Sequence, residues 1–195
     1  KFITSGNFTD FSMDEIIANM VGREIKEKFP RVQCERGRKI LEVKHLNAGR
    51  MVRDVSFDLY EGEIVGIAGL MGAGRTELAM SIFGQSYGTN ISGQLYLDGK
   101  EVQLKTVKQA IKNKLAYVTE DRKGNGLVLS NPIKINTTLA NLDSISPRKI
   151  IDKDKEYQVA EEYRGKLKTK CPTVEQNVGN LSGGNQQKVL LAKWM

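Results

Sequence analysis

A glycine-rich stretch in the first half of the sequence has the residue types and spacing of a phosphate-binding loop. Its residues are Gly69, Leu70, Met71, Gly72, Ala73, Gly74, Arg75 and Thr76. Glycines allow backbone N–H groups to converge on phosphate oxygens, and the hydroxyl of Thr76 stands where a Mg²⁺ ion bridging two phosphates would be coordinated. The pattern therefore predicts binding of a nucleotide together with Mg²⁺.

The basic residue of this loop departs from the usual pattern, because Arg75 stands where lysine is expected. An ammonium is a compact charge that fits beside the β- and γ-phosphates, whereas a guanidinium is larger and planar. We therefore expect the loop to support nucleotide binding more readily than rapid hydrolysis. A glycine-rich turn that binds nothing is the alternative interpretation. The apolar run before the loop and the amphipathic stretch after it disfavour that alternative.

A second string with chemical potential lies near the end of the sequence. It reads Leu181, Ser182, Gly183, Gly184, Asn185, Gln186, Gln187 and Lys188. Serine is a good helix cap, glycines allow close backbone approach, and the positive end of the helix that follows attracts an anion. Capping alone requires neither the second glycine nor the pair of glutamines, so the full string favours a functional motif.

The elements that must position these motifs alternate between strand and helix patterns, which predicts an α/β fold. Nearly continuous apolar character from Glu63 to Ala68 predicts a strand covered on both faces of a mostly parallel sheet. The other expected strands lie around 41–43, 55–59, 95–97 and 115–119, with a hairpin turn at 98–99. Expected helices cover 12–22, the residues after Gly74, and 106–113, and residues 126–180 are richer in helix than in strand.

Composition favours a globular protein, with 39% hydrophobic residues and a net charge of +7 over 195 residues. No run approaches the roughly 18 apolar residues of a membrane-spanning helix. The two cysteines and single histidine do not predict a disulfide or a metal centre. Lysines in the middle of the chain are not interleaved with aromatic residues, which favours a solvated basic face over nucleic-acid binding. These are Lys100, Lys105, Lys108, Lys112, Lys114 and Lys123.

The second string carries the most specific resemblance. LSGGNQQK resembles the signature motif of ABC transporter ATPases, and its NQQKV ending resembles the variant found in bacterial monosaccharide importers. GLMGAGRTE, which extends the loop to Glu77, resembles the degenerate second P-loop of that subfamily, whose chains carry two nucleotide-binding domains in tandem. LAYVTEDRKGNGLVL resembles its Q-loop region, where Glu120, followed by Asp121, takes the approximate place of glutamine. The chain is similar to the ATP-binding subunit of such an importer.

This resemblance implies a P-loop NTPase fold of the ABC ATPase type, with a mixed sheet core, an antiparallel β subdomain and a helical insertion at about residues 126–180. Residues 1–22 would end a preceding nucleotide-binding domain, residues 23–38 would be a linker, and residues 39–195 would belong to the second domain. In this family the Walker B strand, the catalytic glutamate and the switch histidine follow the signature helix. We therefore expect no catalytic residue within these 195 residues.

The resemblance also implies ATP and Mg²⁺ as cofactors and a peripheral position on the cytoplasmic face of the inner membrane. Its implied partners are membrane-spanning permease subunits, the preceding nucleotide-binding domain and, indirectly, a periplasmic sugar-binding protein, and no nucleic acid is expected. The sugar stays open. Two alternatives remain: a regulatory nucleotide-binding domain that does not hydrolyse ATP, favoured by Arg75 and Glu120, and a non-transport ABC ATPase acting on nucleic acid or ribosomes, consistent with the net charge of +7.

Overall fold

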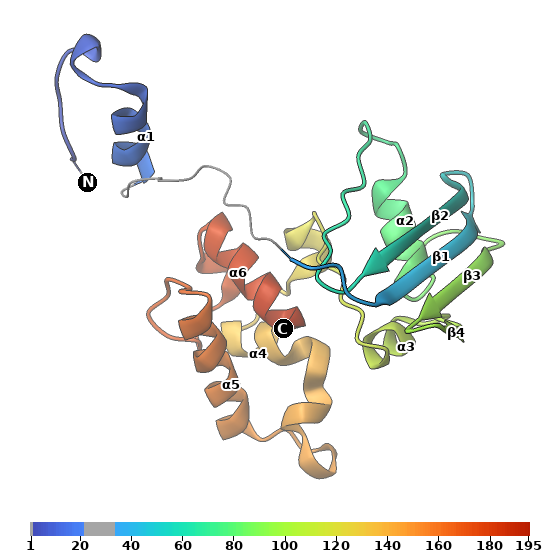
Figure 1. The fold of residues 1–195 in the computed structure, drawn as a ribbon. Helices are drawn as coiled ribbons and strands as arrows, with labels where there is room; N and C mark the ends of the chain where they lie inside the picture. Colours follow the sequence, from blue (N-terminus) through green and yellow to red (C-terminus); the bar gives the residue numbers. More distant parts are fainter. Residues whose placement is uncertain (1, 22–33) are drawn as a thin grey trace.

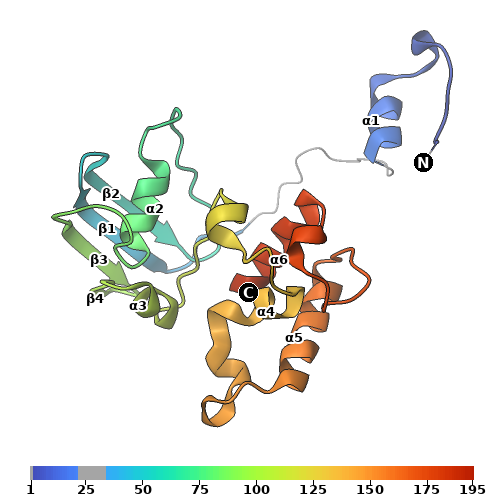
Figure 2. The ribbon, with the colours of Figure 1, turned by 180° about the vertical axis from the view of Figure 1, so that it is seen from behind.

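The computed structural model describes residues 2–21 and 34–195, shown from two sides in Figures 1 and 2. An antiparallel sheet with two short helices forms one part, and a group of helices ending in the C-terminal helix forms another. The predicted linker falls largely on residues 22–33, which lie outside the described residues. None of the described helices combines the length and apolar character that crossing a membrane requires.

The sheet has four antiparallel strands in the order β2-β1-β3-β4. Their bounds are Lys39–Ala48 for β1, Val52–Tyr60 for β2, Ser92–Leu97 for β3 and Lys100–Val102 for β4. Val43 of β1 stands opposite both Phe57 and Leu95, so alternate apolar residues of three strands meet on one face. Asp98 and Gly99 have φ angles of 49° and 76°, as a two-residue hairpin turn requires. The predicted strands and turn of this region are confirmed.

Two helices accompany the sheet. Helix α2 (Arg75–Ile82) buries Leu78 and Ile82 in the same core as Val43 and Leu95. Helix α3 (Val107–Lys112) begins at Thr106, whose hydroxyl accepts from the backbone N–H of Gln109 while the Gln109 side chain accepts from the backbone N–H of Thr106. This reciprocal capping box satisfies backbone donors that a helix start leaves free. Both helices were predicted from the sequence.

Two predicted strands do not form. Residues 63–68 and 115–119 have no strand assignment, and Ile64 is 97% exposed. A strand covered on both faces needs neighbouring strands to bond its backbone and cover its side chains. No described residue supplies that pairing, so the only sheet here is antiparallel and the expected parallel part of the core is not built. An apolar run indicates side chains that need to be buried. It forms a strand only where neighbouring strands are present to pair with its backbone.

The second half of the chain is helical, as predicted. It comprises a π-helical turn Arg122–Gly126, α4 (Ile133–Thr138), 3-10 turns Leu139–Ile145 and Pro147–Lys149, α5 (Lys153–Lys166), a 3-10 turn Val178–Asn180 and α6 (Gly183–Trp194). Eight buried residues form its core, namely Leu127, Ile133, Ala160, Val174, Val178, Leu181, Val189 and Leu190. Helix α6 therefore packs on a core that it shares with α4, α5 and the segment around Leu127.

The N-terminal part contains a 3-10 turn Phe8–Asp10 and helix α1 (Met13–Val21). The predicted capping interaction is present, because the Ser12 backbone donates to a Glu15 carboxylate oxygen at 2.8 Å and the Glu15 backbone donates to the Ser12 hydroxyl at 3.3 Å. Gly22, expected to close this helix, lies outside the described residues.

Candidate nucleotide-binding site

The glycine-rich loop forms a turn that leads directly into α2. The backbone N–H of Ala73 donates to the Leu70 carbonyl at 3.0 Å, and Gly72 and Gly74 have φ angles of 79° and 86°. These left-handed conformations favour glycine. A β-carbon on Gly74 would also stand 2.9 Å from the backbone oxygen of Met51, so Gly74 is required for both conformation and space. The loop thus makes the sharp, glycine-dependent turn expected before a phosphate-binding helix start.

The residues after this turn meet the segment that contains Glu120. The Thr76 hydroxyl donates to a carboxylate oxygen of Glu120 at 3.3 Å, across 44 positions in the sequence. A cavity of about 260 Å³ lies beside this contact, lined by Arg75, Thr76, Ala79, Tyr117, Val118 and Glu120. A hydroxyl and a carboxylate are the hard oxygen donors that Mg²⁺ prefers, and Mg²⁺ in nucleotide sites takes only one or two protein ligands. These residues therefore fit a Mg²⁺–nucleotide group.

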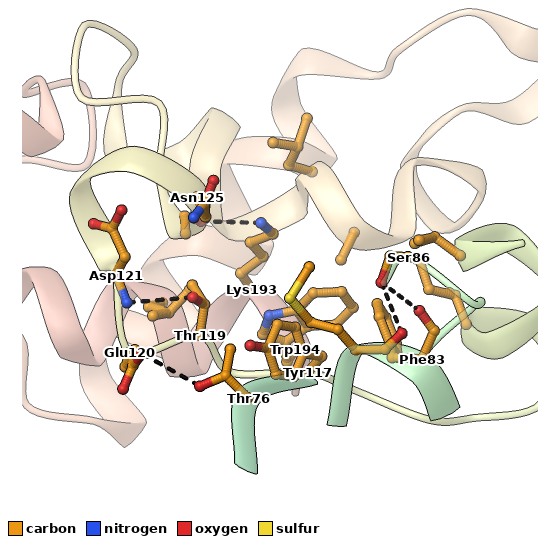
Figure 3. Close-up of a pocket in the computed structure, with 17 residues that line it drawn as sticks. Thr76, Phe83, Ser86, Tyr117, Thr119, Glu120, Asp121, Asn125, Lys193 and Trp194 are labelled. Atoms are coloured by element: carbon orange, nitrogen blue, oxygen red, sulfur yellow. Dashed lines mark hydrogen bonds between the residues drawn. The ribbon is translucent and has the colours of Figure 1, made fainter. Parts of the chain in front are cut away.

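A larger cavity of about 440 Å³ lies between α2 and α3 on one side and α6 on the other (Figure 3). Aromatic side chains form much of its wall, and the rings of Phe83 and Trp194 meet edge to face with centroids 5.5 Å apart. The buried indole nitrogen of Trp194 has no hydrogen-bond partner among the described residues. Polar groups on the wall include Thr119 and Asp121. The cavity is thus an apolar cleft with polar groups at the side of the glycine-rich loop.

Residues 120–126, which we call the connector, contact both α2 and α6. The Arg122 Nε donates to Gln186 at 3.4 Å, and the Lys193 ammonium donates to the Gly126 carbonyl at 3.0 Å. A β-carbon on Gly126 would stand 3.2 Å from Leu190, so this glycine packs directly on α6. Gln186, Leu190 and Lys193 are spaced four and three residues apart and share one helical face. The connector therefore joins α2, through Thr76 and Glu120, to one face of α6.

Lys193 and Asp121 hold the connector in place. Burial lowers the pKa of Lys193, because desolvation disfavours the charged ammonium. The Asp121 side chain caps the π-helical turn by accepting from the Gly124 backbone N–H at 2.9 Å. Short π-helical turns occur frequently at functional sites. The connector is therefore held by specific contacts at both of its ends.

The signature residues stand at the start of α6, but the capping expectation is wrong in one detail. Ser182 occupies the N-cap position, yet its hydroxyl makes no cap bond and instead accepts from the Asn185 side chain at 3.0 Å. Asn185 in turn accepts from the Lys170 backbone. A β-carbon on Gly183 would stand 2.9 Å from the Arg122 guanidinium, whereas nothing lies within 4 Å of the same position on Gly184. The hydroxyl is therefore committed to a side chain of its own motif.

The structure brings some predicted site residues together and leaves others apart. Thr76 and Glu120 line both cavities, Asp121 lines the larger one, and no residue from 181 to 187 lines either. Sequence reasoning missed four residues that form the cleft or its support, namely Tyr117, Arg122, Lys193 and Trp194. Gln186, Leu190 and Lys193 are spaced so that they share one face of a helix. This spacing could have predicted the face of α6 on which the connector packs.

A model of the ABC transporter family matches residues 52–195. The chain belongs to the ABC transporter family. The relatives of this ABC protein include the L-arabinose transport ATP-binding protein AraG of Geobacillus stearothermophilus, 49% identical over 93% of this chain and 37% of the relative. The xylose import ATP-binding protein XylG of Thermoanaerobacter pseudethanolicus is 44% identical over 100% of this chain and 40% of its own. The ribose import ATP-binding protein RbsA of Clostridium perfringens is 44% identical over 100% of this chain and 39% of its own.

This ABC protein therefore spans 37–40% of the length of these curated relatives. Solved structures confirm its fold class. An ATP-binding cassette solved as a dimer with ADP and Pi has a TM-score of 0.61 at 18% identity, covering 80% of this chain and 69% of its own. The protein cbiO1 of Clostridium perfringens, part of an ABC transporter complex, has a TM-score of 0.59 at 18% identity, covering 82% and 61%. The P-loop α/β fold is thereby established, and ATP binding is the family's shared property.

Proposed function

We propose that this chain is part of the ATP-binding and ATP-hydrolysing subunit that energises import of a monosaccharide. One observation carries the proposal: identity of 44–49% to proteins named for arabinose, xylose and ribose transport or import, over 93–100% of the chain. That identity covers the glycine-rich loop, the connector and the signature residues together. Which of these sugars is carried is open, because relatives named for three different sugars are similar to the chain at 44–49% identity.

We assign nucleotide binding to the turn from Gly69 to Gly74 and to the start of α2. Its backbone N–H groups and the helix N-terminus would receive the phosphates, with Arg75 and Glu77 in the first turn of α2. Thr76 and Glu120, 3.3 Å apart, would hold Mg²⁺ with its nucleotide. The metal would supply charge neutralisation for the phosphates, and the chain's own residues would fix its position.

We propose that the signature residues serve a different nucleotide. They lie away from both cavities next to the glycine-rich loop, and Gly184 has open space around its α-carbon. Ser182, Gly183 and Gly184 at the start of α6 would therefore contact ATP bound by the preceding nucleotide-binding domain. In this arrangement the domain of residues 39–195 contributes its signature to a competent site, while its own loop with Arg75 binds nucleotide and turns it over slowly.

We further propose that permease subunits dock at the larger cleft, on the cytoplasmic face of the inner membrane. The cleft is apolar, lies between the sheet part and the helical part, and has the connector as one wall. A helix of a membrane partner seated there would contact Glu120 and α6 together. A sugar-binding protein on the other side of the membrane would act through those permeases.

The test uses the full-length protein and compares Ser182→Arg with Arg75→Ala, with Ser144→Arg as a control for the added charge on an exposed serine of the helical part. We expect Ser182→Arg to lower the ATPase rate by on the order of 100-fold or more, because it removes a contact to the transferred phosphate. Arg75→Ala should change the rate by less than about tenfold. Intact hydrolysis in Ser182→Arg together with abolished hydrolysis in Arg75→Ala would reverse the assignment.

A further inference from the structure

The segment from Val102 to Thr119 is strongly cationic. It contains Lys105, Lys108, Lys112 and Lys114 and no aspartate or glutamate. All four lysines are exposed. The segment alone carries four positive charges of a chain whose net charge is +7. This short stretch, with α3 at its centre, therefore carries a net charge of +4.

Some lysines elsewhere in the structure are neutralised by a nearby carboxylate. Lys39 lies 2.8 Å from Asp58, Lys134 lies 2.7 Å from Glu175, and Lys166 lies 2.6 Å from Glu162. None of the four lysines of the 102–119 segment forms an ion pair with a described residue. Their charges are thus not neutralised within the described part of the chain, and they are available to an external anion.

The segment is also held in place. The capping box of Thr106 and Gln109 fixes the start of α3, and Leu104 and Ala110 are buried. Lys108 and Lys112 are four residues apart and therefore project from neighbouring turns on one side of the helix. A surface that is already ordered loses little conformational entropy when it binds. Lys108 and Lys112 on α3, with Lys105 just before the helix and Lys114 just after it, thus form an ordered cationic surface, which we call the α3 basic face.

The position of this face relative to the cleft suggests what it meets. Val107 and Ile111, on the same helix, line the larger cavity that we assign to permease docking. If that assignment of the proposed function holds, α3 lies beside the docked permease, and a permease is surrounded by membrane. Cytoplasmic leaflets that contain anionic lipids attract clusters of four or more lysines on a helix.

We propose that the α3 basic face binds the anionic headgroups of the membrane beside the permease. A membrane fits better than a nucleic acid, because the only aromatic residue of the segment, Tyr117, is half-buried and its ring lies against Phe83 with centroids 5.7 Å apart. No exposed ring in the segment is therefore available for stacking on bases, which single-stranded nucleic-acid sites use. The lipid contact would orient the ATP-binding subunit at its docking site.

The experiment measures binding of the full-length ATP-binding protein, without permeases, to vesicles of phosphatidylglycerol and phosphatidylcholine in varied ratio. The test variant carries Lys105→Gln, Lys108→Gln, Lys112→Gln and Lys114→Gln. A matched variant carries Lys153→Gln, Lys155→Gln, Lys168→Gln and Lys170→Gln, which removes four exposed lysines from the helical part. Both variants lower the net charge equally, and thermal unfolding checks that each is folded.

We expect wild type to bind anionic vesicles, and not pure phosphatidylcholine vesicles, with an affinity that falls as salt rises. Each lysine near an anionic surface contributes about fivefold to binding, so the test variant should lose on the order of 100-fold or more. The matched variant should stay within about tenfold of wild type.

Three results would overturn the proposal: no binding by wild type, equal losses in the two variants, or displacement from vesicles by a short RNA that binds wild type more tightly than the vesicles do. Vesicle binding and ATP binding are read out separately on the same preparations. A protein that binds vesicles through α3 but fails to bind ATP would contradict the proposed function and leave the lipid contact standing.

Discussion

The two motifs of this chain are supported very differently. Helix α6, which starts at the signature residues, buries Leu190 to 1% exposure in the core of the helical part. Residues 63–68 and the glycine-rich loop after them are open, with Ile64 and Met71 each 97% exposed. The geometry of the signature helix is therefore set by packing within the described chain. The segment before the loop has no such packing, because no described strand pairs with it.

The largest expected effect tests this contrast at the level of packing. Leu190→Ala should lower the free energy of unfolding by about 2–5 kcal/mol, because it leaves a cavity among buried side chains. Ile64→Ala should stay within about 0.5 kcal/mol, because that side chain contributes little buried area in this chain. Urea denaturation of the 195-residue chain measures both. Comparable losses would show that residues 63–68 are covered and that the contrast is false.

The next prediction separates conformation from space within the glycine-rich loop. Gly74→Ala should destabilise the chain by about 1–3 kcal/mol, since a side chain there has an unfavourable φ of 86° and meets the Met51 backbone. Gly72→Ala should lose only about 1 kcal/mol, because its φ of 79° is also unfavourable but nothing lies within 4 Å. Thermal unfolding of the two variants gives the comparison. Equal losses would mean that the contact with Met51 is not maintained in solution.

A third prediction places a glycine-to-alanine substitution in the signature helix, where it should stabilise the chain instead of destabilising it. Gly184 lies in α6 without a left-handed φ, and a β-carbon there would meet nothing within 4 Å. Gly184→Ala should therefore raise the free energy of unfolding by about 0.5 kcal/mol through helix propensity. The same variant should lower the ATPase rate of the full-length protein if the open space receives a phosphate. A destabilised Gly184→Ala chain would show that the start of α6 is not the regular helix described.

The smallest expected effect is a pH dependence of the free energy of unfolding, caused by Lys193, which contacts the connector. Burial lowers the pKa of Lys193 below its ordinary value of 10.5, so the folded chain releases this proton at a lower pH than the unfolded chain does. Between those two pKa values the unfolded state binds more protons, and stability rises with pH. Below that window the burial penalty is constant. Unfolding measured at several pH values up to about 10.5 should show this rise in wild type and not in Lys193→Met. A rise of the same size in Lys193→Met would assign it to another group.

Local patterns predicted a large part of the fold. The capping interaction of Ser12 with Glu15, the hairpin turn at Asp98 and Gly99, and the helix after Gly74 are each specified by a few adjacent residues, and all three appear in the structure. The two missing strands are a different case. Their apolar runs specify burial, but burial and backbone pairing are supplied by residues distant in sequence, which a local pattern does not contain.

The candidate site divides in the same way. Spacing alone singled out residues 69–76 and 181–188, and the resemblance to ABC transporter ATPases assigned Glu120 to the Q-loop region. The contact of Thr76 with Glu120 at 3.3 Å spans 44 residues, and its distance is a property of the folded chain. Arg122 and Lys193 were not singled out, because lysine and arginine occur mostly on exposed surfaces and only the packing of the connector on α6 gives these two a specific role.

The sequence by itself predicted the phosphate-loop and signature motifs, the helices that follow them and the hairpin turn at Asp98 and Gly99, because each depends on residues close together along the chain. Only the tertiary structure decided that the connector 120–126 links α2 to one face of α6, and that an apolar cleft opens between them. It also decided that residues 63–68 have no strand neighbour among the described residues. The physical reason is that turns and helices complete their hydrogen bonds locally, whereas strands, clefts and contacts between elements depend on partners that only folding brings near.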